Sequence, residues 1–184
     1  MKKALRYISS ILILAVLIGI DRVTKYLSVV YLKDKEPFTI IKGVLQLTYI
    51  QNTGSAWGML AGRQTFFIII TLIMLAVMTF IFIIVPHERK YRPLCAVLVT
   101  LAAGAAGNLT DRMANGYVHD FIYFQLIDFP VFNFADICVV LSMIALIILI
   151  FFVYKDNDFD FIKNKFRKKK SSTIKDSGSD EGIS

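Results

Sequence analysis

Long apolar runs alternate with short polar segments along the chain, and this pattern predicts a membrane protein. A helix needs about 17 to 25 apolar residues to cross roughly 30 Å of hydrocarbon. Backbone groups in lipid must be hydrogen-bonded within their own segment, so runs of this length are expected to be helical. Runs of this kind cover about residues 5–25, 66–85, 93–112 and 134–154.

The first apolar run has a basic start, as a secretory signal does. No small-residue cleavage site follows it, and the chain passes directly into Asp21-Arg22-Val23-Thr24-Lys25. We therefore expect a retained transmembrane helix. With the N-terminus inside, most of the 21 lysine and arginine residues fall on the inner side, so both termini are expected to be cytoplasmic.

Two outer loops follow from this topology, at about residues 32–64 and 113–133. The first loop is rich in β-branched and aromatic residues on either side of Lys42-Gly43, which predicts short strands joined by a turn. Segment 52–58 has turn chemistry around Trp57, an aromatic residue suited to the headgroup level. The expected fold class is membrane all-α, with four transmembrane helices and a small extracytoplasmic β-cradle.

Composition agrees with one integral membrane domain over residues 1–154. The chain is 56% hydrophobic and its mean hydropathy is +0.61, above that of a soluble domain. The net charge is +7, and basic residues gather in segment 155–184, which we expect to be disordered and attracted to anionic lipid rather than to nucleic acid. Cys95 and Cys138 lie near opposite membrane faces on this topology, which excludes a disulfide between them.

Ionisable side chains gather where the third and fourth helices reach the outer side. Asn108, Asp111 and Arg112 end the third helix, Asp136 begins the fourth, and Asp120 lies in the loop between them. A charged side chain at the centre of a membrane helix costs about 2.5 to 3.5 kcal/mol, so such residues indicate function.

One face of the third helix carries its polar residues, because Gly104, Asn108 and Asp111 are spaced by four and three. Small residues at 102–107 let a neighbouring helix approach closely. We expect this face to point into the bundle.

Asp120 and Asp136 are the candidates for catalysis. Two carboxylates about 3 Å apart can share one proton, so that the ionised one activates water while the protonated one donates to a carbonyl oxygen. Structural roles are open as well. Asn133 can cap the fourth helix with Asp136 at the third position, and Asp120 can be a solvated loop aspartate like Asp128.

The other polar residues each allow more than one interpretation. Arg112 can contact substrate, or it can pair with a carboxylate and fix the third helix. Asp21 and Lys25 lie one helical turn apart, so they form an intrahelical ion pair or line an outer cavity. His119 is interpreted as a loop histidine, since no serine or cysteine accompanies it, and His87 on the other side excludes a two-histidine metal site.

Five short motifs occur in the order and approximate spacing of a known family. They are D-x-x-T-K at 21–25, N-x-G-x-A-W-G at 52–58, G-N-x-x-D-R at 107–112, V-x-D-F at 118–121 and F-N-x-A-D at 132–136. Together they resemble the bacterial lipoprotein signal peptidases, also called signal peptidase II.

The resemblance implies a four-helix aspartyl endopeptidase of the bacterial cytoplasmic membrane, with its active site at the outer face. It implies cleavage of prolipoproteins just before the diacylglyceryl-modified cysteine, inhibition by globomycin, and no metal or other cofactor. Asp120 and Asp136 match the catalytic pair, and Asp21 and Lys25 match a supporting position. The residues that match the lining or bracing of the site are Asn52, Gly54, Asn108, Asp111, Arg112, Asn133 and Ala135. We expect a monomer in contact with membrane lipid.

Two features depart from the family pattern. His119 stands where a small apolar residue is commoner, which changes the surroundings of Asp120. The tail beyond Tyr154 is long for the family.

A proton- or cation-coupled transporter and a non-catalytic membrane scaffold are the alternatives. In a transporter, Asp21, Asp111 and Asp136 would line a path across the membrane. Such a path needs polar groups throughout the membrane depth, which the second helix and the inner part of the fourth largely lack.

Overall fold

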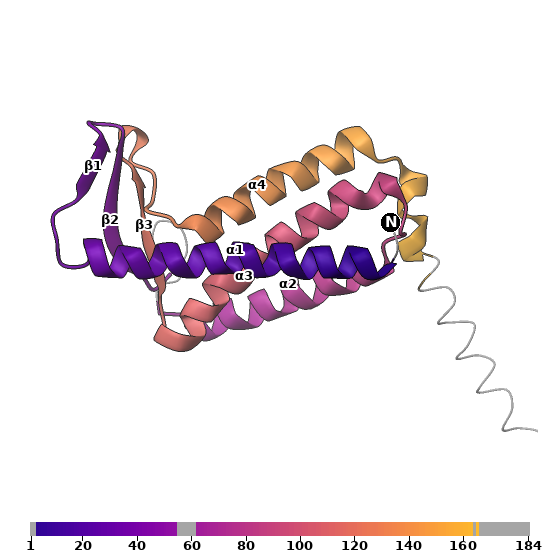
Figure 1. Cartoon of the computed structure of the whole chain (residues 1–184), viewed down its shortest axis with the longest axis horizontal. Coiled ribbons are helices and arrows are strands. Elements are labelled where there is room, and N and C mark those ends of the chain that lie inside the picture. The colour runs from indigo at the N-terminus through magenta and orange to yellow at the C-terminus, as the bar shows by residue number, and fades with distance from the viewer. Residues whose placement is uncertain (1–2, 55–61, 164, 166–184) are drawn as a thin grey trace, which may run out of the picture.

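Four long helices dominate the structure, a computed structural model that describes residues 3–54, 62–163 and 165 (Figure 1). The helices are α1 (Lys3–Leu32), α2 (Gln64–Ile84), α3 (Arg92–Asn115) and α4 (Phe134–Ile148). In the part of the chain that is described, four helical spans are long and apolar enough to cross a membrane. The predicted class, a four-helix membrane protein with a small sheet, is confirmed. The turn expected around Trp57 lies outside the described residues.

The two ends of the bundle differ. Figure 1 shows the sheet at one end and the N-terminus at the other, beside the described part of the C-terminal tail. We call these the sheet end and the tail end.

Helix α1 continues beyond Lys25, the end that the apolar run predicts, to Leu32. No glycine or proline interrupts this stretch, and Asp21, Lys25 and Ser28 form a buried row at helical spacing. The helix ends just before Asp34, which has a φ of 60°. The polar residues of α1 therefore lie inside the helix rather than at its end.

The sheet is antiparallel and has the order β1-β2-β3, from β1 (Phe38–Ile41), β2 (Leu45–Asn52) and β3 (Val118–Phe124). Gly43, with a φ of 73°, lies in the turn that joins β1 to β2, as predicted. The second outer loop, 113–133, contains a strand that the sequence pattern did not predict, because Val118–Phe124 pairs with β2. Pairing with a strand distant in sequence gives this segment the hydrogen bonds that make it a strand.

The prediction of disorder from residue 155 onward was wrong for residues 156–163. A short 3-10 helix, η5 (Asp156–Phe159), follows α4 and folds back on the tail end. The Tyr91 hydroxyl donates to the backbone oxygen of Asp158 at 2.9 Å, and the Phe159 ring packs edge-on against Tyr154. Aromatic packing thus orders the start of the tail.

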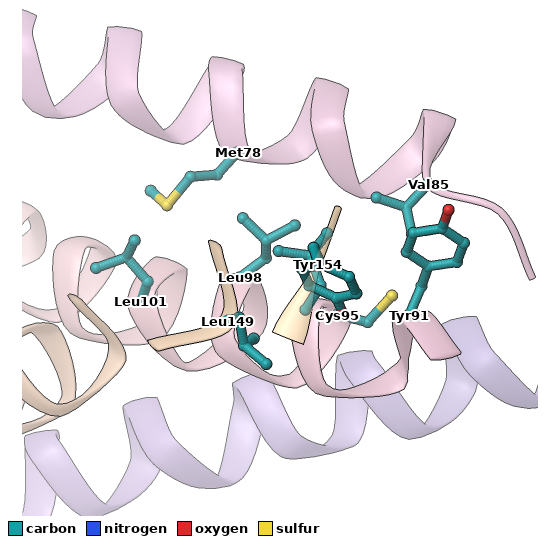
Figure 2. Close-up of a cluster of buried hydrophobic side chains, with 9 residues drawn as sticks. Met78, Val85, Tyr91, Cys95, Leu98, Leu101, Leu149 and Tyr154 are labelled. Atoms are coloured by element: carbon teal, nitrogen blue, oxygen red, sulfur yellow. The ribbon is translucent and has the colours of Figure 1, made fainter. Parts of the chain in front are cut away.

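The apolar core lies towards the tail end, and Figure 2 shows its buried side chains from close by. Its buried members come from α2, from α3 and the connection between them, and from the end of the fourth span, namely Met78, Val85, Tyr91, Leu94, Cys95, Leu98, Leu101, Leu149 and Tyr154. Cys95 and Cys138 are both buried and both free, as predicted.

Helices α3 and α4 approach closely at Gly104, which confirms the predicted role of the small residues. A methyl group on Gly104 would lie 2.5 Å from the carbonyl oxygen of Ala135 and 2.9 Å from Cγ2 of Val139. Only glycine leaves room for this contact, and the contact brings the polar end of α3 against the start of α4.

Gly104→Ala is expected to lower the melting temperature of the detergent-solubilised protein. The added methyl group forces α3 away from α4, and overpacking of this kind costs about 1 to 3 kcal/mol. Gly19→Ala is the matched control, because a methyl group there meets nothing within 4 Å and alanine favours helix. Equal melting temperatures for the two variants would contradict the close packing.

Candidate active site

Asp120 and Asp136 line the same cavity at the sheet end, where β3 meets α3 and α4. The cavity has a volume of about 260 Å³. The other residues that line it are Asn52, Asn108, Arg112, Val118, Phe129, Pro130, Val131, Phe132 and Val140. Two carboxylates separated in sequence thus share one pocket that has an apolar wall on one side.

Asn133 caps the N-terminus of α4, as the sequence predicts. Its side-chain oxygen accepts from the backbone N–H of Asp136 at 3.1 Å, and Oδ2 of Asp136 accepts from the backbone N–H of Asn133 at 3.0 Å. This reciprocal pair fixes the position of Asp136 on the first turn. Because Asp136 also lines the cavity, its capping role and a chemical role are compatible.

A pair of amide side chains links the two aspartates. Nδ2 of Asn133 donates to Oδ1 of Asp120 at 2.6 Å and to Oδ1 of Asn108 at 3.2 Å. Nδ2 of Asn108 donates to Oδ1 of Asp136 at 2.7 Å. Asn52 holds the other oxygen of Asp120, because its Nδ2 donates to Oδ2 at 2.8 Å. The hydrogen bonds therefore orient both carboxylates from several elements at once.

Asp120 is buried in β3, and the interpretation as a solvated loop aspartate was wrong. Its residue exposure is 2%. Burial, and then the negative charge of Asp136, raise the pKa of Asp120 to about 6. A proton is therefore available on this side chain much closer to neutral pH than on an exposed aspartate.

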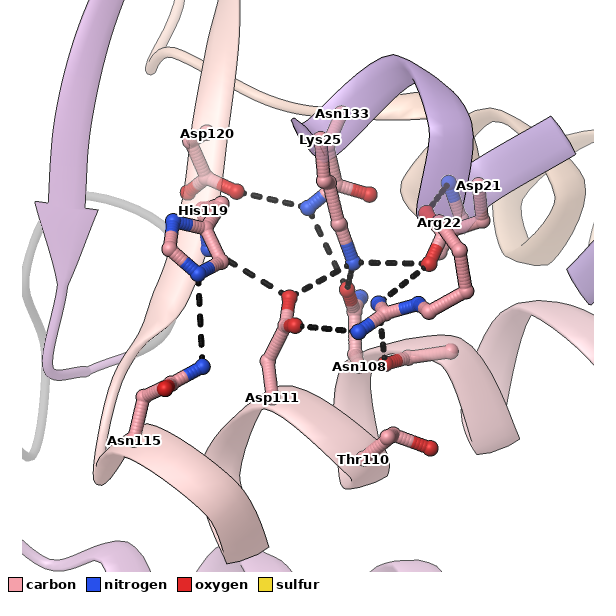
Figure 3. A network of polar contacts seen from close by, with 12 residues as sticks. Asp21, Arg22, Lys25, Asn108, Thr110, Asp111, Asn115, His119, Asp120 and Asn133 are labelled. Carbon is pink, nitrogen blue, oxygen red and sulfur yellow. Dashed lines mark hydrogen bonds and ion pairs between the residues drawn. The ribbon is translucent and has the colours of Figure 1, made fainter. Parts of the chain in front are cut away.

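A cluster of four charged side chains lies behind the amide pair (Figure 3). Nζ of Lys25 lies 3.1 Å from Oδ2 of Asp21, which confirms the predicted intrahelical pair, and 2.8 Å from Oδ2 of Asp111. Lys25 also donates to Oδ1 of Asn108 at 2.8 Å. The cluster thus connects α1 to α3 and, through Asn108, to the carboxylate of Asp136.

Arg22 is the residue that sequence reasoning missed. Its Nη1 lies 2.6 Å from Oδ1 of Asp111, and its Nη2 lies 2.6 Å from Oδ2 of Asp21. Nη2 also donates to the backbone oxygen of Gly107 at 2.9 Å. Two cations therefore neutralise two buried carboxylates. The available signal was the position of Arg22 directly after Asp21 within an apolar run.

Ala135 shows why the start of α4 needs a small residue. Its backbone N–H donates to Oδ1 of Asp21 at 3.2 Å, so a carboxylate from α1 satisfies one of the free amides of α4. Its Cβ would lie 3.3 Å from a methyl group on Gly107. A larger side chain at 135 would separate α4 from α3.

Arg112 contacts the first outer segment instead of a carboxylate. Its Nη2 donates to the backbone oxygen of Gly54 at 3.1 Å, and its guanidinium lies 4.9 Å from the centre of the Phe67 ring. The backbone N–H of Gly54 in turn donates to Oδ1 of Asn52 at 2.9 Å. Among the described residues Arg112 forms no ion pair, so the predicted pairing belongs to Arg22.

His119 lies next to Asp120 in β3, and alternation along the strand directs it to the other face of the sheet. The Tyr49 hydroxyl and Nδ1 of His119 are 2.7 Å apart, and Nε2 contacts the Asn115 amide. Burial lowers the pKa of His119, so the ring is neutral at pH 7. Across residues 3–54 and 62–163, no three histidine, cysteine or acidic side chains are grouped as metal ligands would be.

The fold and the site together define a multi-pass membrane protein with two aspartates, one buried and one half-buried, in a pocket at one end. A family model described as signal peptidase (SPase) II matches residues 13–152. The chain belongs to the signal peptidase II family, and it is therefore a peptidase and a multi-pass bacterial membrane protein.

Known relatives agree with this assignment. Proteins named lipoprotein signal peptidase from Staphylococcus aureus strains JH9 and Newman are 39% identical over 143 residues, which cover 76% of this chain and 86% of each relative. A bacterial membrane enzyme solved by the in meso method at 2.3 Å has a TM-score of 0.69 and 37% identity over 77% of this chain and 87% of its own. A second such structure, at 1.9 Å, has the same TM-score and identity and covers 79% and 94%.

Lys25→Gln is expected to destabilise the protein by about 3 to 5 kcal/mol, because it leaves the buried Asp21 and Asp111 with a single cation. Thermal unfolding in detergent measures the effect. Lys42→Gln at the same end is the control, since Lys42 is exposed and should tolerate the change. If Lys25→Gln lowers the stability no more than Lys42→Gln does, the charged cluster contributes nothing to stability.

Proposed function

We propose that this protein is an aspartic endopeptidase that removes the signal peptide from lipid-modified prolipoproteins, with Asp120 and Asp136 as the catalytic pair. Family membership supports the peptidase activity, and the name of the relatives, lipoprotein signal peptidase, supports the substrate class. The observation that carries the catalytic assignment is the placement of two carboxylates, Asp120 buried and Asp136 half-buried, around one cavity. Cleavage just before the diacylglyceryl-modified cysteine follows from the same assignment.

In the proposed mechanism the two aspartates share one proton. Asp120, whose pKa is about 6, holds the proton and donates it to the oxygen of the scissile carbonyl. Asp136, on the first turn of α4 where a helix N-terminus favours negative charge, takes a proton from water as the water oxygen attacks the carbonyl carbon. Collapse of the tetrahedral intermediate breaks the C–N bond: Asp136 gives its proton to the leaving amine, and a hydroxyl of the intermediate returns a proton to Asp120 as the C=O bond of the product acid forms.

The other residues that match the family motifs form two groups, those that line the cavity and those that lie behind it. Asn52, Asn108 and Arg112 line the cavity, so we assign them to substrate binding and to orientation of the carboxylates. The residues assigned to bracing lie behind the cavity wall and are Asp21, Lys25, Gly54, Asp111, Asn133 and Ala135.

The apolar wall of the cavity suits a substrate that enters from lipid. Phe129, Pro130, Val131 and Phe132 precede α4 and line the pocket together with Val140. We assign these side chains to the apolar residues of a signal peptide near the scissile bond. A globomycin-type cyclic peptide would compete for the same wall.

The sheet end is assigned to the outer side of the membrane and the tail end to the cytoplasm. The excess of lysine and arginine at the tail end and in the tail favours this orientation. It also places the cavity near the leaflet that carries lipid-modified prolipoproteins. We further propose that the chain acts as a monomer, since one chain supplies both aspartates.

The transporter alternative is not favoured. Its path would have to cross the tail half of the bundle, where the buried residues of α2 and α3 form an apolar cluster. The contacts between charged and amide side chains are at the sheet end. Among the described residues, the apolar cluster contains no charged or amide side chain.

Asp120→Asn and Asp136→Asn are each expected to lower the rate of cleavage of a lipid-modified prolipoprotein at least about 100-fold, because either change removes a proton donor or acceptor from the pair. Cleavage is followed with purified protein in detergent, and circular dichroism verifies the helical fold. Asp128→Asn is the control, since Asp128 is exposed and should not affect turnover. Substantial turnover by either cavity variant would exclude the pair.

The value of kcat/KM is expected to fall as pH rises through about 6. The pKa of Asp120 is raised, so its protonated form is present below this pH and is lost above it. His119→Gln should leave this fall in kcat/KM, the alkaline limb of the pH profile, in place. The reason is that the pKa of His119 is lowered and its side chain lies outside the cavity lining. If the limb disappears in His119→Gln, the titrating group is the histidine and not Asp120.

A further inference from the structure

A second cavity, with charged and apolar lining residues, lies at the tail end, between α1, the connection from α2 to α3, and the first turn of α3. Its volume is about 170 Å³, and Arg6, Ser9, His87, Glu88 and Arg92 are among its lining residues. Helix α3 begins at Arg92, so the positive end of its dipole faces this region. The cavity is therefore rich in positive charge, with Glu88 as its one acidic lining residue among those described.

Arg6 is a buried cation that has no ion-pair partner among the described residues. It is 6% exposed, and Nη1 and Nη2 donate to the backbone oxygens of Val85 and Phe82, at 3.0 and 2.5 Å, at the end of α2. Its Nε is buried without a hydrogen-bond partner. A buried positive charge of this kind favours an anion beside it.

His87 has a hydrogen atom to donate in the same place. Nη1 of Arg6 lies 3.3 Å from Nδ1 of His87, and because arginine is only a donor, Nδ1 accepts and the ring proton is on Nε2. Nε2 is buried and has no hydrogen-bond partner. Burial, and then the charge of Arg6, lower the pKa of His87, so the ring stays neutral. Its N–H group suits an anionic oxygen.

An apolar groove adjoins the cavity and shares Ser10 and Val99 with it. Its volume is about 340 Å³, and its walls come from α1, α2 and α3, with Leu14, Met78 and Leu98 among them. The groove lies within the spans that are apolar enough to cross a membrane. A positively charged cavity at the span ends therefore continues into an apolar groove within the spans.

We propose that this cavity and groove form a binding site for an anionic glycerophospholipid, whose phosphate contacts Arg6, His87 and Arg92 and whose acyl chain lies in the groove. The charge pattern selects against a zwitterionic choline lipid, because its quaternary ammonium would approach the two arginines. The groove favours a lipid over free phosphate, because only a lipid buries apolar surface there. The site lies at the opposite end from the peptidase pocket and does not depend on the proposed catalytic function.

The test measures binding of phosphatidylglycerol and of phosphatidylcholine with the same acyl chains to the full chain in detergent, by native mass spectrometry and melting temperature. Phosphatidylglycerol is expected to bind more tightly and to raise the melting temperature by several degrees. Arg92→Gln should weaken its binding about tenfold, as expected for loss of one charge-assisted contact. Arg92 is chosen because it is exposed, so its replacement should leave the fold intact. Arg6→Gln would be harder to interpret, because Arg6 also donates to the backbone at the end of α2.

Two further variants separate the sources of binding. Leu14→Trp fills the groove and should weaken phosphatidylglycerol binding. It should not change the cavity beside Arg6, because Leu14 does not line that cavity. Arg63→Gln, an exposed change at the sheet end, is the control and should have no effect. Equal binding of the two lipids, or unchanged affinity in Arg92→Gln, would overturn the proposal. Displacement of the lipid by equimolar inorganic phosphate, together with unchanged affinity in Leu14→Trp, would assign the cavity to a free anion instead.

Discussion

The sheet end depends on one interaction, a cluster of four charges that neutralise one another: Asp21, Arg22, Lys25 and Asp111. Each ion costs several kcal/mol to remove from water, and only close pairing with hydrogen bonds recovers this cost. The four charges lie on α1 and α3, and Asp21 also accepts from the start of α4. Since any one charge left alone would be strongly unfavourable, the three helices have one favourable arrangement here.

Apolar helices in lipid have little hydrophobic reason to prefer one register over another, because lipid tails are as apolar as the side chains that they contact. Close contact at Gly104 and polar contact at Asn108 supply the missing specificity in this bundle. Strand β3 then adds Asp120 from outside the helices, held by pairing with β2 and by Asn52 and Asn133. The pocket is therefore assembled from helix and sheet contacts that depend on each other.

Sequence alone predicts the features whose cause is local. Apolar run length predicts the four helices, and helical spacing predicts the buried face with Asn108 and the pair Asp21 and Lys25. The cap by Asn133 is equally local. These predictions are confirmed because each rests on neighbours within about one helical turn.

The predictions that failed concern contacts between distant segments. Segment 118–124 becomes a strand only because β2 lies beside it, and residues 156–163 are ordered by aromatic rings from elsewhere in the chain. Pairing with a carboxylate was one alternative for Arg112, and Arg22 makes such a pair instead, because its long side chain reaches α3 from α1. Spacing along one helix cannot predict which arginine reaches a neighbouring helix.

Neutral amide side chains lie between the charged cluster and the two aspartates of the cavity. If Lys25 contacted Asp136 directly, an ion pair would hold that carboxylate charged, and the two aspartates would have less reason to share a proton. Lys25 instead donates to Asn108, and Asn108 donates to Asp136, so orientation passes along the chain of hydrogen bonds without a direct ion pair. Asn133 donates both to Asn108 and to Asp120, so Asp120 is also held by an amide. The amide layer thus fixes the geometry of the carboxylates, and the pKa of Asp120 is raised mainly by burial and by the charge of Asp136.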